Sequence, residues 1–211
     1  MSVSGLEVGS LRVLHRLLVA TTNPDKLREI RELLRDVPVD LASLNDIEEV
    51  PAPEENGETF AENARLKARY YAAHAGLPTV AEDSGLVIDT LDGEPGIHSA
   101  RFLRPEATYP QRFAEISRRL AERPTAQRSA RFVCALAVVD AGEVVFEATG
   151  IIEGEIADTP RGNGGFGYDP IFFYPPYGTT LAEVQQDAKL AVAHRGQAFR
   201  QLAEWLRSRS A

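Results

Sequence analysis

An α/β fold is indicated most directly by the stretch LLVATTNPDKLREIRELL, residues 17–34. It opens with an apolar run over 17–20, which is typical of a buried strand. Asn23 then suits a helix N-cap and Pro24 the first helical position, and apolar residues recur at helical spacing from Leu27 to Leu34. Strand, tight turn and helix therefore follow one another without a gap.

Helix and strand signals continue to alternate along the chain. Thr59 and Glu62 have the spacing of a capping box, and Gly76 marks the end of the helix that they begin. The dipeptide Ala141-Gly142 predicts a hairpin between two β-rich segments. The expected strands are 79–81 and 86–91 around a polar turn, then 131–140 and 143–156, and the further expected helices are 110–121 and 196–207. The predicted fold class is α/β, with a mixed β-sheet flanked by helices.

Composition limits the classes of protein that fit. The chain has 211 residues, of which 44% are hydrophobic and 26% charged, as in an ordinary globular protein. Its formal net charge of −8 argues against a nucleic-acid partner, because a protein that neutralises many phosphates normally has a basic face. No stretch reaches the roughly 20 apolar residues of a membrane span. We therefore expect a cytoplasmic protein with no membrane partner.

The ends of the domain and the single cysteine lead to two further expectations. Residues 1–16 are rich in Ser and Gly at first, so we expect a flexible N-terminal extension there and one domain over 17–211. Cys134 lies in an apolar run, which indicates a buried structural thiol rather than a nucleophile.

Four polar clusters interrupt the expected elements. The first is the turn between strand and helix, where free backbone N–H groups and the helix dipole favour an anion, although an ordinary N-cap with a surface lysine would look the same. The turn is not a Walker A loop, because its glycine pattern is absent. The candidate anion-binding residues are Thr21, Thr22, Asn23, Pro24, Asp25 and Lys26.

The next two clusters are acidic. Carboxylates crowd residues 54–58, where they are either solvated or share a cation. Glu82 and Asp83 stand with Ser84 between two apolar segments, and strand ends are where α/β folds place their sites. Magnesium prefers such hard oxygen ligands together with phosphate oxygens and water. These acids are therefore candidate magnesium ligands.

The fourth cluster is C-terminal and combines aromatic rings with cations. Glycines near 164–167 permit close backbone approach, and two aromatic rings in the same loop offer faces for a nucleobase. A lysine and a His-Arg pair at the start of a helix add donors and positive charge. The candidate binding residues are Phe166, Gly167, Tyr168, Asp169, Lys189, His194 and Arg195.

Six ordered blocks of this sequence closely resemble the inosine triphosphate pyrophosphatase family, that is, the dITP/XTP pyrophosphatases. The resemblance covers about 17–207. The blocks are LVATTNPDK (18–26), ENGETFAENA (55–64), EDSGL (82–86), PGIHSAR (95–101), GFGYDP (165–170) and HRG (194–196).

The resemblance implies an elongated sheet with two lobes around an active-site cleft, a homodimer and a Mg²⁺ cofactor. It implies hydrolysis of deaminated purine nucleoside triphosphates (ITP, dITP, XTP) to the monophosphate and pyrophosphate, which keeps them out of DNA and RNA. Asp83 resembles the catalytic proton acceptor and a metal ligand, Glu54 a second metal ligand, and Ser84 a substrate contact alongside the residues named above. Two departures from the family pattern are Asp25, where glycine is common, and Ala193, where serine is common.

Two alternative functions are compatible with the residues. A Maf-type nucleotide pyrophosphatase would act on pyrimidine or modified nucleotides instead. A non-hydrolytic nucleotide-binding module would bind ITP without releasing pyrophosphate. The presence of Glu54, Asp83 and Lys189 together disfavours the second alternative.

Overall fold

The structure is a computed structural model, which describes residues 14–123 and 127–209. A curled seven-stranded sheet runs through it in the order β2-β1-β3-β4-β5-β6-β7. The strands are β1 (Arg16–Val19), β2 (Asp40–Ser43), β3 (Thr79–Ile88), β4 (Ser129–Asp140), β5 (Glu143–Ile156), β6 (Phe172–Tyr174) and β7 (Thr179–Thr180). β1 is parallel to both β2 and β3, and every later pairing is antiparallel. The predicted α/β fold with a mixed sheet is confirmed.

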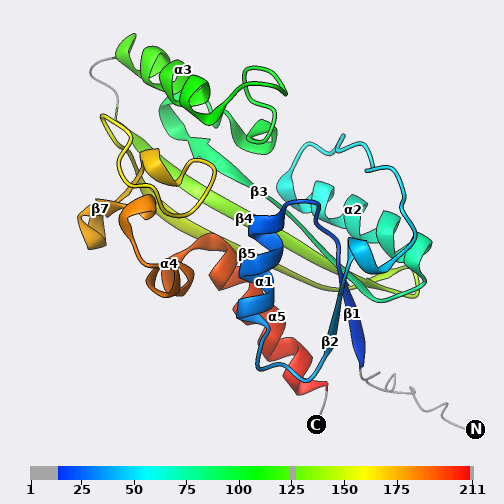
Figure 1. Ribbon diagram of the computed structural model, residues 1–211. Helices are drawn as coiled ribbons and strands as arrows, with labels where there is room; N and C mark the ends of the chain where they lie inside the picture. The colour runs from blue at the N-terminus through cyan, green and yellow to red at the C-terminus, as the bar shows by residue number, and fades with distance from the viewer. Residues whose placement is uncertain (1–13, 124–126, 210–211) are drawn as a thin grey trace, which may run out of the picture.

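Helices cover both faces of the sheet. The described α-helices are α1 (Pro24–Leu33), α2 (Phe60–Ala75), α3 (Tyr109–Ala121), α4 (Gln186–Val192) and α5 (His194–Ser208). Short 3-10 turns lie at Leu44–Asp46, Asp89–Leu91, Gly96–His98, Asp169–Ile171, Pro175–Tyr177 and Leu181–Glu183. α1 and α5 pack side by side on one face and α2 covers the other (Figure 1).

The β1 sequence shows why its apolar run is continuous. Leu17 and Val19 pack in the core under α1 and α5, whereas Leu18 and Ala20 pack in the core under α2. Successive strand side chains point to opposite faces, so a strand covered on both faces needs apolar residues throughout.

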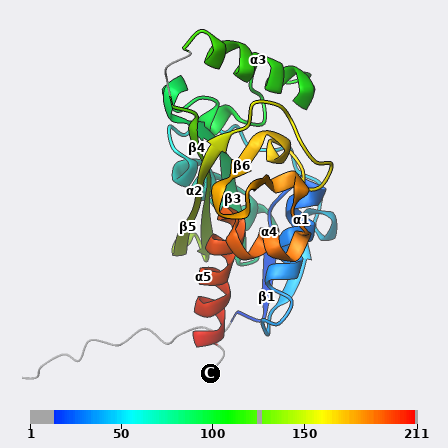
Figure 2. The same ribbon diagram turned by 90° about the vertical axis from the view of Figure 1, so that its left-hand side faces the viewer.

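A third core cluster builds a separate lobe at the far end of the sheet. Leu86 and Ile88 of β3 pack there with Phe113 and Ile116 of α3 and with Phe172 of β6. We call this part the α3 lobe, and it stands apart from α1 and α5 in both views (Figures 1 and 2).

Local signals for helix ends and turns are confirmed. The Asn23 side chain accepts hydrogen bonds from the backbone N–H groups of the first turn of α1, and Thr59 and Glu62 form the capping box of α2. Gly76 closes α2 with a φ of 62°, and Ala141 and Gly142 turn the β4–β5 hairpin with φ values of 50° and 87°. Cys134 is fully buried, as expected.

One strand prediction is wrong. The expected polar turn between 79–81 and 86–91 does not exist, because β3 runs unbroken over Thr79–Ile88 and pairs with β4 along its whole length. Glu82 and Asp83 can lie inside a strand because side chains from distant elements hold their carboxylates.

Most of the expected N-terminal extension lies outside the described residues. Of its last three residues, Leu14 is buried in the core under α1 and α5, and Arg16 begins β1. No helix within 14–123 and 127–209 combines the length and apolar character needed to cross a membrane.

Candidate active site

The predicted polar clusters meet in a cleft beside the middle of β3. A cavity of about 250 Å³ forms its acidic end and one of about 90 Å³ its aromatic end. The two cavities adjoin and together make up the cleft, because they share the lining residues Asn23, Lys26, Ser84 and Ala100. We call them the acidic cavity and the aromatic cavity.

The turn between β1 and α1 lies where the two cavities meet. Asn23 Oδ1 accepts hydrogen bonds from the N–H groups of Asp25 at 2.9 Å and Lys26 at 3.2 Å, so part of the predicted anion-binding backbone is satisfied internally. Lys26 Nζ lies 3.3 Å from a Glu82 carboxylate oxygen and remains partly exposed. Asp25, which stands where glycine is common in the family, pairs with Arg28 at 2.8 Å. The arginine compensates the negative charge that the aspartate adds beside the turn.

Asp83 is held in the acidic cavity by α2. It is 6% exposed, and its two carboxylate oxygens accept hydrogen bonds from Asn63 at 3.2 Å and Lys67 at 3.1 Å. Asn63 and Lys67 are four residues apart and therefore share one face of α2. Lys67 Nζ also donates to Glu55 at 3.2 Å, so one ammonium bridges two carboxylates.

The Asp83 carboxyl has a raised pKa. Burial is the largest cause and the Glu55 charge adds to it, while Lys67 and Lys26 partly offset both. A carboxylate with a raised pKa is a stronger proton acceptor than an exposed aspartate, so this position suits a general base.

A buried ion network lies between the turn and the aromatic cavity. Glu29 of α1 accepts hydrogen bonds from Lys189 at 3.0 Å and from Arg195 at 2.7 Å. Lys189 also donates to Asp169 at 2.6 Å, and Arg195 to Glu82 at 3.0 Å. Each cation thus has two carboxylates, which compensates the cost of burying it.

The network also orders the loop that carries Phe166. Gly165 has a φ of 65°, and a side chain there would collide with the Asp169 carboxylate, which accepts the Phe166 N–H at 2.8 Å. The Lys189 ammonium and the Arg195 guanidinium lie 4.8 Å and 5.5 Å from the centre of the Phe166 ring. Phe166 is half-buried, so part of its ring stays available in the cavity.

His194 contributes a neutral ring to the same cavity. It stacks on Phe132 with ring centres 4.9 Å apart, and within the described residues its Nδ1 has no hydrogen-bond partner. Burial, with the Arg195 charge adding to it, lowers the His194 pKa well below its usual range. The imidazole is therefore uncharged at neutral pH and keeps an unsatisfied polar atom.

Most of the predicted site residues line this cleft. They are Thr21, Thr22, Asn23, Lys26, Asp83, Ser84, Phe166, Tyr168, Asp169, Lys189, His194 and Arg195. Pro24, Asp25, Gly167 and Glu54 belong to the same segments but do not line either cavity. Glu54 is exposed, whereas its neighbour Glu55 lines the acidic cavity and reaches Lys67.

Sequence reasoning missed Lys67 and Glu29. Lys67 repeats the α2 face of Asn63 after one turn, a spacing that could have associated it with the acidic block 55–64. Glu29 precedes the core residue Ile30 on α1 and is only 1% exposed, but an acid on a helix normally indicates a solvated face.

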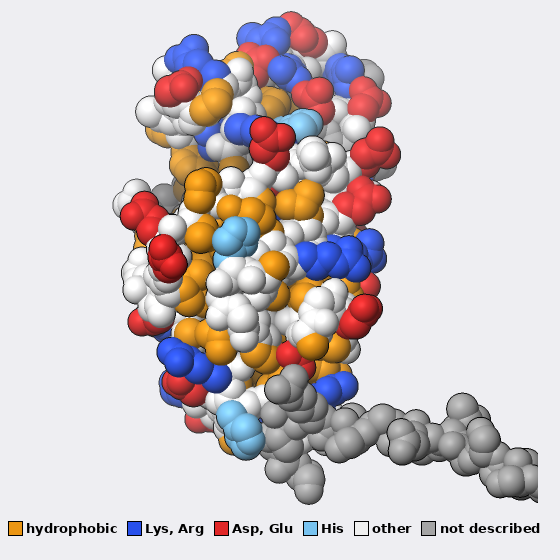
Figure 3. Space-filling view, turned by 90° about the vertical axis from the view of Figure 1, so that its right-hand side faces the viewer, with side chains coloured by type: hydrophobic (Ala, Val, Ile, Leu, Met, Phe, Trp, Pro, Cys, Tyr) orange, Lys and Arg blue, Asp and Glu red, His pale blue; other side chains and the backbone are white. Residues whose placement is uncertain are grey.

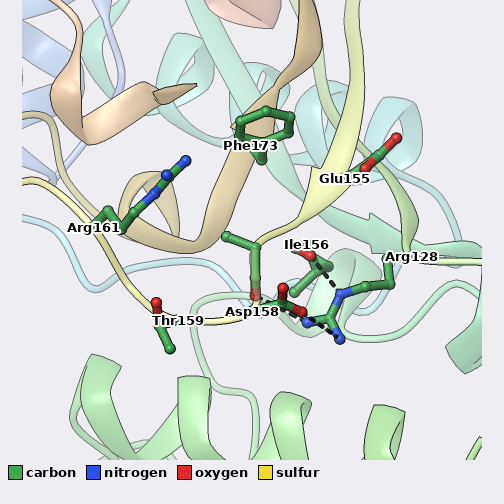
Figure 4. A pocket seen from close by; sticks show the side chains of 8 residues that line it. Arg128, Glu155, Ile156, Asp158, Thr159, Arg161 and Phe173 are labelled. Carbon is green, nitrogen blue, oxygen red and sulfur yellow. Dashed lines mark hydrogen bonds and ion pairs between the residues drawn. The ribbon is translucent and has the colours of Figure 1, made fainter. Parts of the chain in front are cut away.

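A separate cavity of about 350 Å³ lies along β5 and β6, away from these residues. There Arg128 donates to the backbone oxygens of Ile156 and Ala157 at 2.6 and 2.9 Å, and Arg161 lies over Phe173 (Figure 4). No predicted site residue lines it.

Comparison with known proteins agrees with this geometry. The family model described as the Ham1 family matches residues 17–205. A dITP/XTP pyrophosphatase of Geobacter sulfurreducens is 46% identical over 191 residues, covering 90% of this chain and 96% of the relative. One from Photorhabdus laumondii is 43% identical over 199 residues, covering 92% and 100%.

Solved structures give the same result. A HAM1 protein from Coxiella burnetii has a TM-score of 0.87 at 40% identity, covering 92% of this chain and 100% of that one. A nucleoside-triphosphatase / dITP/XTP pyrophosphatase from Mycobacterium abscessus has a TM-score of 0.71 at 40% identity, covering 90% and 98%. With its family model, its relatives and its fold in agreement, the chain belongs to the Ham1 family.

Proposed function

We propose that this chain hydrolyses the deaminated purine nucleoside triphosphates dITP, ITP and XTP to the monophosphate and pyrophosphate, which keeps these bases out of DNA and RNA. The relatives from Geobacter and Photorhabdus bear the name dITP/XTP pyrophosphatase. The observation that carries the proposal is that the cavity of Asp83 adjoins the cavity of Phe166 and shares lining residues with it. One ligand with a triphosphate and a flat base would fill both.

Asp83 is the residue that we assign as general base. It accepts a proton from the water that attacks the α-phosphate, a new P–O bond forms, and the bond to the β-phosphate breaks with its electron pair leaving on pyrophosphate. Lys26 and Lys67 line the same cavity, where their positive charges compensate the negative charges of the phosphates. Thr21 and Thr22 line it as well and contribute hydroxyls.

Mg²⁺ is the cofactor that we propose. Asp83 and Glu55 both line the acidic cavity, and the Lys67 ammonium lies 3.1 and 3.2 Å from their oxygens, so Glu55 replaces Glu54 as our choice of second ligand. Across the described residues no group of three or more Asp, Glu, His or Cys side chains could hold a metal ion. Mg²⁺ usually takes only one or two carboxylates, and phosphate oxygens and water supply the other ligands. When bound, the metal offsets the charge of the triphosphate.

Hydrogen-bond donors in the aromatic cavity account for the proposed choice of nucleobase. Hypoxanthine and xanthine have an oxygen acceptor at C6, where adenine has an amine donor. Lys189 and Arg195 are donors only, so adenine would leave a buried polar group unpaired at a cost of about 1–3 kcal/mol. We expect dITP, ITP and XTP to be hydrolysed far faster than ATP.

A pyrophosphate-release assay over dITP, ITP, XTP, GTP, ATP and dTTP, with and without Mg²⁺, tests the proposal. Preference for dTTP would favour the Maf-type alternative, and ITP binding without pyrophosphate release would favour the non-hydrolytic module. Membership of the Ham1 family argues against both.

Asp83→Asn tests the assigned base. A positioned general base contributes about 10²–10⁴-fold, so we expect turnover of dITP to fall by at least about 100-fold in a folded protein. Asp36→Asn is the matched control, because that aspartate is exposed and outside the cleft. Turnover by Asp83→Asn near the level of the Asp36→Asn control would contradict the assignment.

We further propose a homodimer that works in the cytoplasm without nucleic-acid or membrane partners. Hydrophobic side chains gather in the middle of the face on the α2 side (Figure 3). A groove between α2 and the β4–β5 turn includes the apolar residues Ala72, Leu77 and Pro78. Light scattering after size-exclusion chromatography measures the assembly, and a monomer at micromolar concentration would contradict this proposal.

A further inference from the structure

The α3 lobe contributes one partly exposed aromatic side chain to the cleft. Tyr109 begins α3, lines the aromatic cavity and is 37% exposed. Its backbone is anchored by the capping box of Thr108 and Gln111, whose side chains bond each other's N–H groups at 3.0 and 3.4 Å. A side chain at Gly167 would lie 3.6 Å from the Tyr109 hydroxyl, so the phenol lies against the loop that carries Phe166.

A buried cation supports this ring from behind. Arg112 is 4% exposed, and its guanidinium carbon lies 5.0 Å from the centre of the Tyr109 ring. Its terminal nitrogens reach the backbone oxygens of Ser99 at 3.5 Å and Pro105 at 3.4 Å. Over 14–123 and 127–209 no carboxylate lies within ion-pair distance of Arg112, and its Nε has no hydrogen-bond partner.

Such an arrangement is costly for the fold. A buried guanidinium normally requires a carboxylate, and aromatic faces and carbonyl oxygens compensate it only in part. Tyr168 completes the cluster, with its ring edge-on to Tyr109 at 5.3 Å and its hydroxyl donating to Ser99 at 2.8 Å. The cation and the second ring thus fix the orientation of Tyr109 toward the cavity.

The Tyr109 phenol is affected by burial and by nearby charges. Burial is the largest cause of the raised pKa of Tyr109, and Asp169 and Asp25 add to it while Arg112 opposes it. Asp25 belongs to the first turn of α1. The aromatic cavity is lined by Tyr109 of α3 and by Lys26 of α1, so residues of both helices border it.

We propose that Tyr109 contacts the purine base of the substrate and that Arg112 is a positioning residue for it. This inference rests on the proposed function, which assigns the aromatic cavity to the base. The ring forms the wall of the cavity that the α3 lobe supplies, whereas Phe166 and His194 come from the C-terminal segments. The phenyl ring makes the contact with the base.

Binding measurements on four variants test the proposal. We expect Tyr109→Ala to weaken IMP binding and raise KM for dITP by about tenfold, as for loss of a base-stacking ring. The kcat for dITP should stay within about twofold of the wild type, and affinity for inorganic tripolyphosphate, which has no base, should not change. Tyr109→Phe keeps the ring and should lose less IMP affinity than Tyr109→Ala. Arg112→Met should weaken the binding of IMP but not of tripolyphosphate, and Tyr177→Ala is the control at an exposed tyrosine.

Two results would overturn the proposal. One is wild-type affinity of Tyr109→Ala for IMP, and the other is an equal loss for IMP and tripolyphosphate. Tyr109→Leu, which keeps apolar bulk against Phe113, replaces the alanine variant in both comparisons if that variant does not fold. A wild-type protein that releases no pyrophosphate from dITP would refute the proposed function instead, while the IMP comparison would still decide the role of Tyr109.

Discussion

Replacing Glu29 by glutamine should destabilise the protein, because this carboxylate neutralises two buried cations. Glu29 is 1% exposed and accepts hydrogen bonds from Lys189 at 3.0 Å, Arg195 at 2.7 Å and Gln186 at 3.1 Å. Breaking a buried ion pair by removing one charge costs about 3–5 kcal/mol. Lys189 and Arg195 each keep a second carboxylate, so we expect the lower end, about 3 kcal/mol.

Urea unfolding of Glu29→Gln followed by circular dichroism measures this loss. In a domain of this size, about 3 kcal/mol corresponds to a fall in Tm of about 6–12 °C. Glu32→Gln is the matched control, since it makes the same change on an exposed position of α1 and should shift the free energy of unfolding by less than about 0.5 kcal/mol. Equal stability of the two variants would refute the reasoning.

The pH dependence separates lost charge from lost packing. Burial alone would raise the pKa of Glu29, but Arg195 and Lys189 more than offset this, so its folded-state pKa lies below the ordinary 4.5. A carboxyl group whose folded-state pKa is lowered contributes stability that is fully present above its unfolded-state pKa. This stability is lost as the pH falls through the folded-state pKa. The difference between wild type and Glu29→Gln should therefore shrink below about pH 4.5, and a constant difference would indicate a packing effect.

Two further predictions concern buried groups beside this network. His194 stays neutral in the folded protein, whereas in the unfolded chain it gains a proton below about pH 6.5. The free energy of unfolding should therefore fall by up to about 1.4 kcal/mol per pH unit as the pH drops below this value. Urea titrations of His194→Phe, which keeps a ring on Phe132, should show a weaker dependence, and an equal slope would contradict the assignment. Burial raises the pKa of Cys134 well above its usual range, so its thiol should resist Ellman's reagent in the folded protein and react in guanidinium chloride. Rapid reaction under native conditions would show that the site is accessible.

Elements with local causes were predictable from the sequence. The Asn23 cap with Pro24 behind it, the Thr59–Glu62 capping box and the Ala141-Gly142 turn depend on hydrogen bonds and dihedral angles within a few residues. The residues that make these contacts are close together in the sequence, so the elements can be recognised without knowing the tertiary structure.

The continuity of β3 was not predictable, because polar residues in a row normally indicate a turn. Glu82 and Asp83 stay in the strand because their partners come from elsewhere, and Arg195 is 113 residues away from Glu82 in the chain. Lys67, Glu29 and Arg112 were missed for the same reason. Whether a charged helix residue faces solvent or a buried partner depends on which helix face the core covers.

The sequence by itself determined the kind of fold and, through its resemblance to a family, the chemistry to look for. It also determined which segments carry the acids, cations and aromatic rings. Only the tertiary structure decided that Glu55 rather than Glu54 lines the acidic cavity and that Tyr109 of a separate lobe lines the aromatic one. The physical reason is that sequence spacing specifies contacts within one turn or one hairpin, whereas a cleft is made by side chains that meet only after the sheet and its helices have packed.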